Sequence, residues 1–546
     1  MIYRIVSWAL ILFACFYGIG SYPLLDDNEG LYAAIARDML HSGQWIIPHL
    51  NGVPYLEKPP MLYWLIAGSM SLFGENEWAA RLVPALAFFG TACLLQRFLT
   101  RTSRSEAAGY SAALIMVTSL PMLAMGRMIL CDTIMTCFLS AALMYFYDWY
   151  TDQNKRSLMG FYMFLALAVL TKGFIAIILA GGTIAAFLYW QRSTPRQQFL
   201  RVLSPRGILL FLCIAAPWHI AASWQEPGFA WFYFINEHLL RFLNMREPHD
   251  YYTGHSWYYL PRLLAYLLPW TLFLALLVEK PGLVAWQYPV LTKFLWSWFL
   301  FCLLFFSVSG AKANYYMIAG IPALVMLLAL HLKCHMDSGT RIVPWLASGC
   351  LLLVAVALWV IRCACRESSG DLYPTCEAVS LPIIISAGVY ALISILLCWR
   401  IPRRWIVPLL GAHILLLLPL LISGVNMASD HLSQKTVADF LKASSYHDVA
   451  VYQEFEELSS LAFYRDKPLL MVDSRSNDLL YGKMHSATPY FMTLSEWATH
   501  SPRLPLVLFT RRISGAMADL RAINIDLKNV CIVRRFERVA VISMCD

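Results

Sequence analysis

The chain has 546 residues, of which 59% are hydrophobic and 14% are charged, and its mean hydropathy is +0.57. Soluble domains contain roughly 45–50% apolar residues, so this composition excludes an ordinary soluble enzyme. The net charge of +8 comes from basic residues that lie between apolar runs, where they indicate membrane topology rather than nucleic-acid binding.

Apolar runs of roughly 17–25 residues recur along most of the chain, and each could cross a hydrocarbon core about 30 Å thick. The first run follows Arg4 and lacks a small-residue cleavage site, so we interpret it as a retained signal anchor. The segments 29–40 and 61–73 predict two helices that lie at the membrane surface. The sequence predicts about thirteen spans, at residues 5–25, 80–99, 108–126, 133–150, 158–172, 174–190, 207–224, 259–279, 292–309, 315–332, 343–362, 380–399 and 405–425.

Lysine and arginine concentrate in alternate loops, which the positive-inside rule assigns to the cytoplasm. The amino terminus is then cytoplasmic, whereas the loops 26–79, 224–258 and 363–379 and the segment after about residue 426 are periplasmic. This arrangement predicts a multi-pass membrane protein.

The fourteen cysteines lie mostly in apolar runs and show no metal-type spacing. Cys363, Cys365 and Cys376 are exceptions, because they fall in a polar loop. If that loop is periplasmic, Cys376 could pair with one of the other two, and free thiols are the alternative.

The composition changes near residue 428, which divides the chain into a membrane domain at 1–427 and a soluble periplasmic domain at 428–546. Short β-type runs at 449–452, 469–472, 505–509 and 539–543 alternate with helical patterns such as 436–443. This alternation predicts a small α/β domain.

The predicted topology places the unusual polar residues of the membrane domain on the periplasmic side. Isolated, each has an ordinary explanation: Lys172 and Lys312 could extend to the interface, and His238 could be an interfacial histidine. Asp132 is the hardest to explain in this way, because a charge at the edge of a span is costly unless it is paired or hydrated. The full set is Asp26, Asp27, Glu29, Glu57, Lys58, Arg127, Asp132, Lys172, Glu237, His238, Arg241, His255, Lys312 and Tyr316.

Carboxylates and cations at one membrane edge suit a reaction on a lipid phosphate. A carboxylate can orient or deprotonate an acceptor, and lysines or arginines can stabilise a departing phosphate. The set therefore predicts transfer of a sugar from a lipid-phosphate carrier, with an oxocarbenium-like transition state.

The stretch DDNEGLYAAIARDMLHSGQWIIPHLNGVPYLEKPPMLYWL, which begins at Asp26, resembles the first periplasmic loop of the bacterial lipid A aminoarabinose transferases, relatives of the protein O-mannosyltransferases. AVLTKGF, FINEHLLRFL, HSWYYLP and FFSVSGAKANYYMIAGIPAL are similar to later motifs of the same family. The resemblance implies a polytopic α-helical fold with about thirteen spans and a C-terminal periplasmic α/β domain. It also implies an undecaprenyl-phosphate sugar donor, held in membrane lipid, and an envelope acceptor such as lipid A.

The resemblance also implies roles for individual residues. The catalytic acids correspond to Asp26, Asp27, Glu29 and Asp132. Members of the family usually show Asp-Glu in the first motif, whereas Asn28 precedes Glu29 here. Either Asp26 or Asp27 then acts as the base, or the acceptor differs. The residues expected to bind the donor or its phosphate are Glu57, Lys58, Arg127, Lys172, His238, Arg241, His255, Lys312 and Tyr316.

Three alternatives remain open. A divalent metal could bind near Glu57 and His238, although no ligand spacing requires one. A protein O-glycosyltransferase would share the donor chemistry. A lipid-linked-sugar transporter would usually place ionisable groups near the bilayer midplane, often in repeated halves, and neither feature occurs in this sequence.

Overall fold

A computed structural model of the chain divides into two compact units. The first, called here the helical unit, contains Met1–Ile19 and Arg81–Ser423; the second, called the mixed unit, contains Gly20–Ala80 and Gly424–Asp546. The boundary predicted near residue 427 assigned the first loop to the membrane domain, whereas here the loop belongs to the same unit as the C-terminal segment. The predicted boundary stays a prediction. The structure describes residues 1–191, 195–249, 253–279, 281–339, 342–367, 384–385, 388–389, 402–444, 446–485, 489–500, 504–523 and 525–544.

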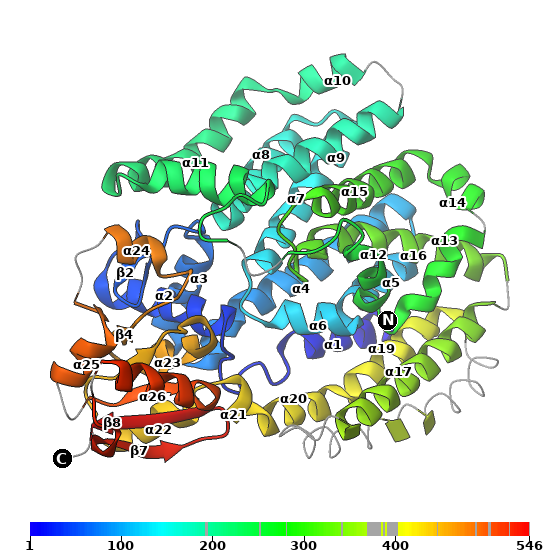
Figure 1. Cartoon of the computed structure of the whole chain (residues 1–546). Helices are drawn as coiled ribbons and strands as arrows, with labels where there is room; N and C mark the ends of the chain where they lie inside the picture. The colour runs from blue at the N-terminus through cyan, green and yellow to red at the C-terminus, as the bar shows by residue number, and fades with distance from the viewer. Residues whose placement is uncertain are drawn as a thin grey trace. The chain divides into compact units, whose positions relative to one another are not determined.

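The described residues of the helical unit are mostly helical (Figure 1). Side-chain caps begin several of them: Ser105 accepts from the Ala108 N–H, Asn154 from Arg156 and Ser204 from Gly207. The α-helices are α1 Ile2–Phe16, α4 Glu77–Ser103, α5 Glu106–Thr118, α6 Leu120–Arg127, α7 Cys131–Asp152, α8 Lys155–Lys172, α9 Ile175–Gln191, α10 Pro195–Val202, α11 Pro205–Gln225, α12 Tyr259–Tyr266, α13 Leu276–Glu279, α14 Pro281–Gln287, α15 Pro289–Val308, α16 Ile321–Asp337, α17 Ile342–Glu367, α19 Ile406–Leu416 and α20 Leu418–Met427.

Four shorter helices of other types complete this unit. They are the π-helix η1 Trp231–Leu240 and the 3-10 helices η2 Trp270–Ala275, η3 Tyr316–Gly320 and η4 Arg403–Trp405. A ten-residue π-helix is unusual, because π geometry mostly occurs as single turns and often at functional sites.

Five described helical segments are long and apolar enough to cross a membrane, and the number rises to seven if each of two bent pairs counts as one span. The two bent pairs fall on the expected spans at 108–126 and 259–279: α5 and α6 meet at 72°, and the second pair bends by 115°. Pro121 begins the α6 side of the first bend, and the Trp270 indole donates to Thr118 there at 3.0 Å. The chain is thus a polytopic helical membrane protein; thirteen spans remain a prediction, and the one at 380–399 lies largely outside the described residues.

The mixed unit combines the first loop with the C-terminal segment. The expected helices at 29–40 and 61–73 are confirmed as α2 Asn28–Ser42 and α3 Met61–Phe73, and their position at a membrane surface stays a prediction. Between them, β1 His49–Leu50 and β2 Val53–Pro54 form a hairpin. Asn51 and Gly52 turn it with φ of 53° and 79°, values that suit an Asn-Gly turn.

The C-terminal segment contains a six-stranded sheet with the order β5-β4-β3-β6-β8-β7. The first four strands in this order are parallel, and β8 and β7 are antiparallel to their neighbours; Figure 1 shows these last two side by side in red. The strands are β3 Ala450–Tyr452, β4 Leu470–Val472, β5 Phe491–Met492, β6 Leu506–Phe509, β7 Val530–Arg535 and β8 Val539–Met544.

The four expected strands are confirmed within a residue at each end, as is the expected helix at 436–443. The sequence missed β5, which has two residues, and β7, an edge strand whose residues are mostly exposed and therefore lack a buried apolar pattern. The helices of this segment are α21 Ser429–Leu432, α22 Lys435–Ala443, η5 Glu456–Leu458, α23 Ser459–Tyr464, α24 Leu480–His485, α25 Leu494–His500, η6 Thr510–Arg512, α26 Ile513–Ala522 and η7 Leu527–Asn529.

Helix α2 packs directly on α23 within the mixed unit. A Cβ atom on Gly30 would lie 2.3 Å from the backbone nitrogen of Ser460, so only glycine permits this approach. The contact ties the first loop to residues more than 400 positions later in the chain. The acidic turn before α2 is therefore part of the same compact unit as the C-terminal sheet.

Candidate functional site

The predicted site residues divide between the two units. The mixed unit holds the first-loop residues Asp26, Asp27, Glu29, Glu57 and Lys58. The helical unit holds Arg127, Asp132, Lys172, Glu237, His238, Arg241, His255, Lys312 and Tyr316. That both groups serve one reaction remains a prediction, and each group is described by itself.

In the helical unit, Asp132 and Lys172 form an ion pair between Oδ1 and Nζ. Asp132 lies in the first turn of α7, where the helix dipole favours a carboxylate, and Lys172 is the last residue of α8. The two helices form a hairpin around Gln153 and Asn154, which brings the start of one to the end of the other. The side chains are only 4% and 11% exposed, so removing either would leave a buried charge.

Tyr316 completes this cluster. The Lys172 ammonium lies 4.5 Å from the centre of the Tyr316 ring and 5.7 Å from that of Tyr315, within the range of cation–π attraction. The structure thus brings together three of the predicted residues, Asp132, Lys172 and Tyr316. An acid and a cation beside aromatic faces can stabilise a sugar cation and a phosphate, respectively.

A second cluster surrounds Glu237 on the π-helix η1. Arg241 donates to Oε2 at 2.8 Å, and Arg246 donates to Oε1, so one buried carboxylate carries two guanidinium groups. Asn236 fixes the following loop through two hydrogen bonds to the backbone of Glu247, at 2.7 and 3.0 Å. Guanidinium groups are the side chains best suited to bidentate binding of a phosphate.

In the mixed unit, the three neighbouring acids of the first loop have different surroundings. Glu29 is fully buried and accepts the Leu25 N–H at 3.1 Å. Asp26 accepts from the Ser460 N–H at 3.0 Å, the Ser460 hydroxyl at 2.6 Å and the Gln434 amide at 2.9 Å. Asp27 is exposed, and its carboxylate makes no hydrogen bond among the residues that the structure describes. Of the three, Asp27 is therefore the acid best placed to meet a substrate.

Burial raises the pKa of Asp26 to about 7, although its three donors act in the opposite direction. A proton on Asp26 would weaken those hydrogen bonds, because all three partners are donors to a carboxylate. This environment suits a residue that holds the turn in place.

Glu57 and Lys58 interact with each other. The Lys58 ammonium lies 3.5 Å from Glu57 Oε2 and donates to the Glu57 carbonyl at 3.2 Å. Their side chains are 8% and 14% exposed, so both groups are largely withdrawn from solvent. Their predicted role at the donor phosphate stays a prediction.

Comparison with known proteins decides the family. The chain is 30% identical over 417 residues to the undecaprenyl phosphate-alpha-4-amino-4-deoxy-L-arabinose arabinosyl transferase of Aeromonas hydrophila subsp. hydrophila, covering 73% of this chain and 74% of that protein. It is 31% identical over 418 residues to the enzyme of the same name from Aeromonas salmonicida, covering 74% of each. The chain belongs to this aminoarabinose transferase family.

Two further comparisons agree with that assignment. The family model described as dolichyl-phosphate-mannose-protein mannosyltransferase matches residues 57–221. The crystal structure of ArnT from Cupriavidus metallidurans bound to undecaprenyl phosphate superposes with a TM-score of 0.82 at 22% identity, covering 99% of this chain and 97% of that one. The fold of the chain is therefore that of an aminoarabinose transferase.

A divalent metal near Glu57 and His238 was left open by the sequence and stays untested, but the contacts of His238 bear on it. Its Nδ1 faces the Tyr233 carbonyl oxygen at 2.6 Å, and its Nε2 accepts the Phe174 N–H at 3.1 Å. Both ring nitrogens are thus used to hold the turn after α8. Among the described residues, no three His, Cys, Asp or Glu side chains gather as metal ligands would.

Three other predicted residues make structural contacts. Arg127 donates to the carbonyl oxygens of Ala14 and Tyr17 at the end of α1. Lys312 donates to the carbonyls of Phe306 and Ser307, each at 2.7 Å, and burial lowers its pKa. The His255 ring stacks on Trp257 with centres 5.7 Å apart. These contacts explain the three residues without a ligand, and their donor-binding roles stay predictions.

Sequence reasoning missed Arg246, Ser459, Ser460 and Gln434. Arg246 follows Glu237 by nine residues in an irregular loop, a spacing that predicts no contact. The serines and Gln434 contact the first loop across more than 400 residues, and a single sequence carries no signal for such a pairing.

Proposed function

We propose that the chain is an inverting glycosyltransferase that moves 4-amino-4-deoxy-L-arabinose from undecaprenyl phosphate to an envelope acceptor, with lipid A as the first candidate. The observation that carries the proposal is family membership, at 30–31% identity over 73–74% of the chain. The likeness of fold to ArnT supports the same class of lipid-carrier reaction.

The clusters supply the groups that this reaction needs. Arg241 and Arg246 lie together beside Glu237, and their guanidinium groups would stabilise the departing undecaprenyl phosphate. Asp132 would stabilise the positive charge that develops on the sugar, and the ion pair with Lys172 orients its carboxyl group. In the first loop, the exposed carboxylate of Asp27 would orient or deprotonate the acceptor.

Asn28 determines which acceptors are compatible with this scheme. An amide cannot take a proton, so Asp27 is the base if the acceptor is a hydroxyl group. A phosphate acceptor, as on lipid A, is already ionised and needs orientation only. Asp27→Asn should then lower turnover about tenfold with a phosphate acceptor, because only orientation is lost. With a hydroxyl acceptor it should lower turnover roughly 10²–10⁴-fold, because the base is lost.

The proposed orientation places the amino terminus in the cytoplasm and the first loop and C-terminal sheet in the periplasm, within the bacterial inner membrane. Cys531 on β7 is disulfide-bonded, which supports an oxidising compartment for the sheet. Reporter fusions after Arg104 and Arg196 should be cytoplasmic, and a fusion after Ser429 should be periplasmic. A cytoplasmic fusion at Ser429 would contradict the proposal.

A direct test reconstitutes the purified chain with an undecaprenyl-phosphate donor labelled in its aminoarabinose. Lipid A, a peptide with serine and threonine, and no acceptor are compared. We expect labelled lipid A and one released undecaprenyl phosphate for each sugar transferred. Label on the peptide alone would identify a protein O-glycosyltransferase, and movement of intact donor across the bilayer without release would identify a transporter.

A further inference from the structure

The acidic turn before α2 is held by backbone hydrogen bonds from the C-terminal part of the mixed unit. The Asp27 N–H donates to the Glu456 carbonyl at 3.1 Å, and the Ser459 hydroxyl donates to the Asp27 carbonyl at 2.9 Å. One residue earlier, the Asp26 N–H donates to the Leu432 carbonyl at 2.8 Å. Both backbone groups of Asp27 are thus fixed by a segment remote in sequence.

Ser460 links this turn to the sheet segment through its side chain. Its hydroxyl donates to Asp26 at 2.6 Å and accepts the Gln434 N–H at 2.8 Å, while the Gln434 side chain also donates to Asp26 at 2.9 Å. Ser459, Ser460 and Gln434 are buried. Buried hydrogen bonds of this kind fix geometry closely, because leaving any partner unsatisfied is unfavourable.

The backbone of Asp27 is strained. Its φ of 61° and ψ of −122° lie in a region that residues with a Cβ rarely adopt, and its side chain forms no cap for α2. Strained residues persist only where their surroundings impose the conformation, and they are frequent at active sites. Here the bonds from Glu456 and Ser459 impose it, and the Asp27 carboxylate is left exposed.

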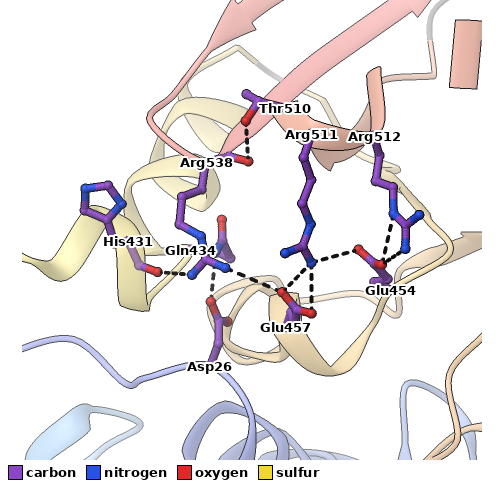
Figure 2. Close-up of polar contacts among 9 residues, drawn as sticks. All are labelled: Asp26, His431, Gln434, Glu454, Glu457, Thr510, Arg511, Arg512 and Arg538. Atoms are coloured by element: carbon purple, nitrogen blue, oxygen red, sulfur yellow. Dashed lines mark hydrogen bonds and ion pairs between the residues drawn. The ribbon is translucent and has the colours of Figure 1, made fainter. Parts of the chain in front are cut away.

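A network of arginines and glutamates braces the segment that holds Asp27 (Figure 2). Arg511 donates to both oxygens of Glu457 at 3.0 and 2.9 Å, and Arg538 lies 3.5 Å from the same carboxylate while donating to the His431 carbonyl at 2.6 Å. Glu457 belongs to η5, the helix that directly precedes Ser459, so these pairs fix η5 against η6 and against the residue before β8.

We propose that Ser459 and Ser460 are positioning residues for the transfer reaction, because they hold Asp27 in a strained conformation that presents its carboxylate to the acceptor. The C-terminal sheet segment then acts in catalysis through the first loop. The inference rests on the proposed function for its kinetic consequence, whereas the strain itself is independent of any substrate.

The kinetic test compares Ser459→Ala, Ser460→Ala and the double variant in the reconstituted transfer assay. We expect kcat with lipid A to fall about threefold in each single variant and about tenfold in the double variant, the loss also expected of Asp27→Asn with a phosphate acceptor, with KM for the donor unchanged. Ser460→Thr, which keeps the hydroxyl, should restore most of kcat. The matched control is Ser69→Ala, since Ser69 is a buried serine of the same unit that donates to the Ala79 carbonyl. Unchanged kcat in the double variant would overturn the proposal.

A second test needs no substrate. Asp27→Gly should raise the melting temperature of the wild-type protein, because glycine adopts a positive φ without strain. In the Ser459→Ala/Ser460→Ala background the same change should give little or no gain, since the turn can relax. Equal gains in both backgrounds, or a loss in the wild type, would overturn the positioning role. If wild-type protein shows no transfer, the proposed function fails. The melting temperatures of these variants still show whether the two serines hold the Asp27 backbone in a strained conformation.

Discussion

The two units stabilise their buried acids in different ways. In the helical unit, Asp132 faces Lys172 and Glu237 faces two arginines, so charge meets charge. In the mixed unit, Asp26 is held by a hydroxyl, an amide and a backbone N–H, all of which are neutral. Opposite charges offset the cost of burying an acid, whereas the neutral donors of Asp26 fix the position of the backbone, and burial raises the pKa of that carboxyl group. The ion pairs of the helical unit are therefore expected to act on the charges of the substrate, and the hydrogen bonds of Asp26 to fix the geometry of the first loop.

The largest effect is expected from breaking the pair between Asp132 and Lys172. Asp132→Asn leaves a buried ammonium, which should destabilise the protein by about 3–5 kcal/mol and lower transfer roughly 10²–10⁴-fold. Asp132→Asn/Lys172→Gln should recover part of the stability but none of the transfer. Thermal unfolding in detergent and the transfer assay measure the two effects.

The control for that pair is Lys333 with Asp337, whose carboxylate is 64% exposed. Asp337→Asn, alone or with Lys333→Gln, should change the free energy of unfolding by less than about 1 kcal/mol. If both pairs gave the same small effect, burial of the pair between Asp132 and Lys172 would not contribute to its importance for stability.

An intermediate effect is expected from the two arginines at Glu237. Arg241 is 19% exposed and can reach a ligand, so Arg241→Ala should lower kcat/KM roughly ten- to a hundredfold, corresponding to about 1.5–3 kcal/mol for a lost charge-assisted contact. Arg246 is 4% exposed, and Arg246→Ala should chiefly lower stability. Kinetics and melting temperatures of both variants test this division, and an unchanged donor KM and kcat in Arg241→Ala would contradict it.

The smallest effect concerns pH. Because the pKa of Asp26 is raised to about 7, above the value near 3.9 of an unfolded aspartate, the fold favours the protonated form. This contribution is fully present below about pH 4 and is lost as pH rises towards 7. Asp26→Asn should therefore show a smaller fall in melting temperature than wild type between about pH 5 and pH 8. Identical pH profiles would show that Asp26 does not titrate in this range.

The sequence predicted those features that depend on local pattern. Periodicity and apolar runs identified α2, α3 and four of the six strands, because these elements bury regular faces. Assigning sides of the membrane by basic loops put all the predicted site residues on one side, which stays a prediction; within that set, the structure shows that Asp132, Lys172 and Tyr316 are in contact.

Features that depend on distant contacts could not be predicted. The bond from Ser460 to Asp26 joins residues 434 positions apart, and neither residue is unusual in its local sequence. The conformation of Asp27 also has no local signal, since a positive φ would by itself suggest glycine or asparagine. For this reason the sequence left Asp26 and Asp27 as equal candidates for the base, and only their surroundings distinguish them.

The most direct test of the account is the turnover of Asp26→Asn compared with Asp27→Asn in the same reconstituted assay. In Asp26→Asn the new amide oxygen can still accept from Ser460, so we expect this variant to keep turnover within about threefold of wild type, while Asp27→Asn loses at least about tenfold. Full activity of Asp27→Asn, or a greater loss in Asp26→Asn, would contradict the claim that the mixed unit presents Asp27 to the acceptor.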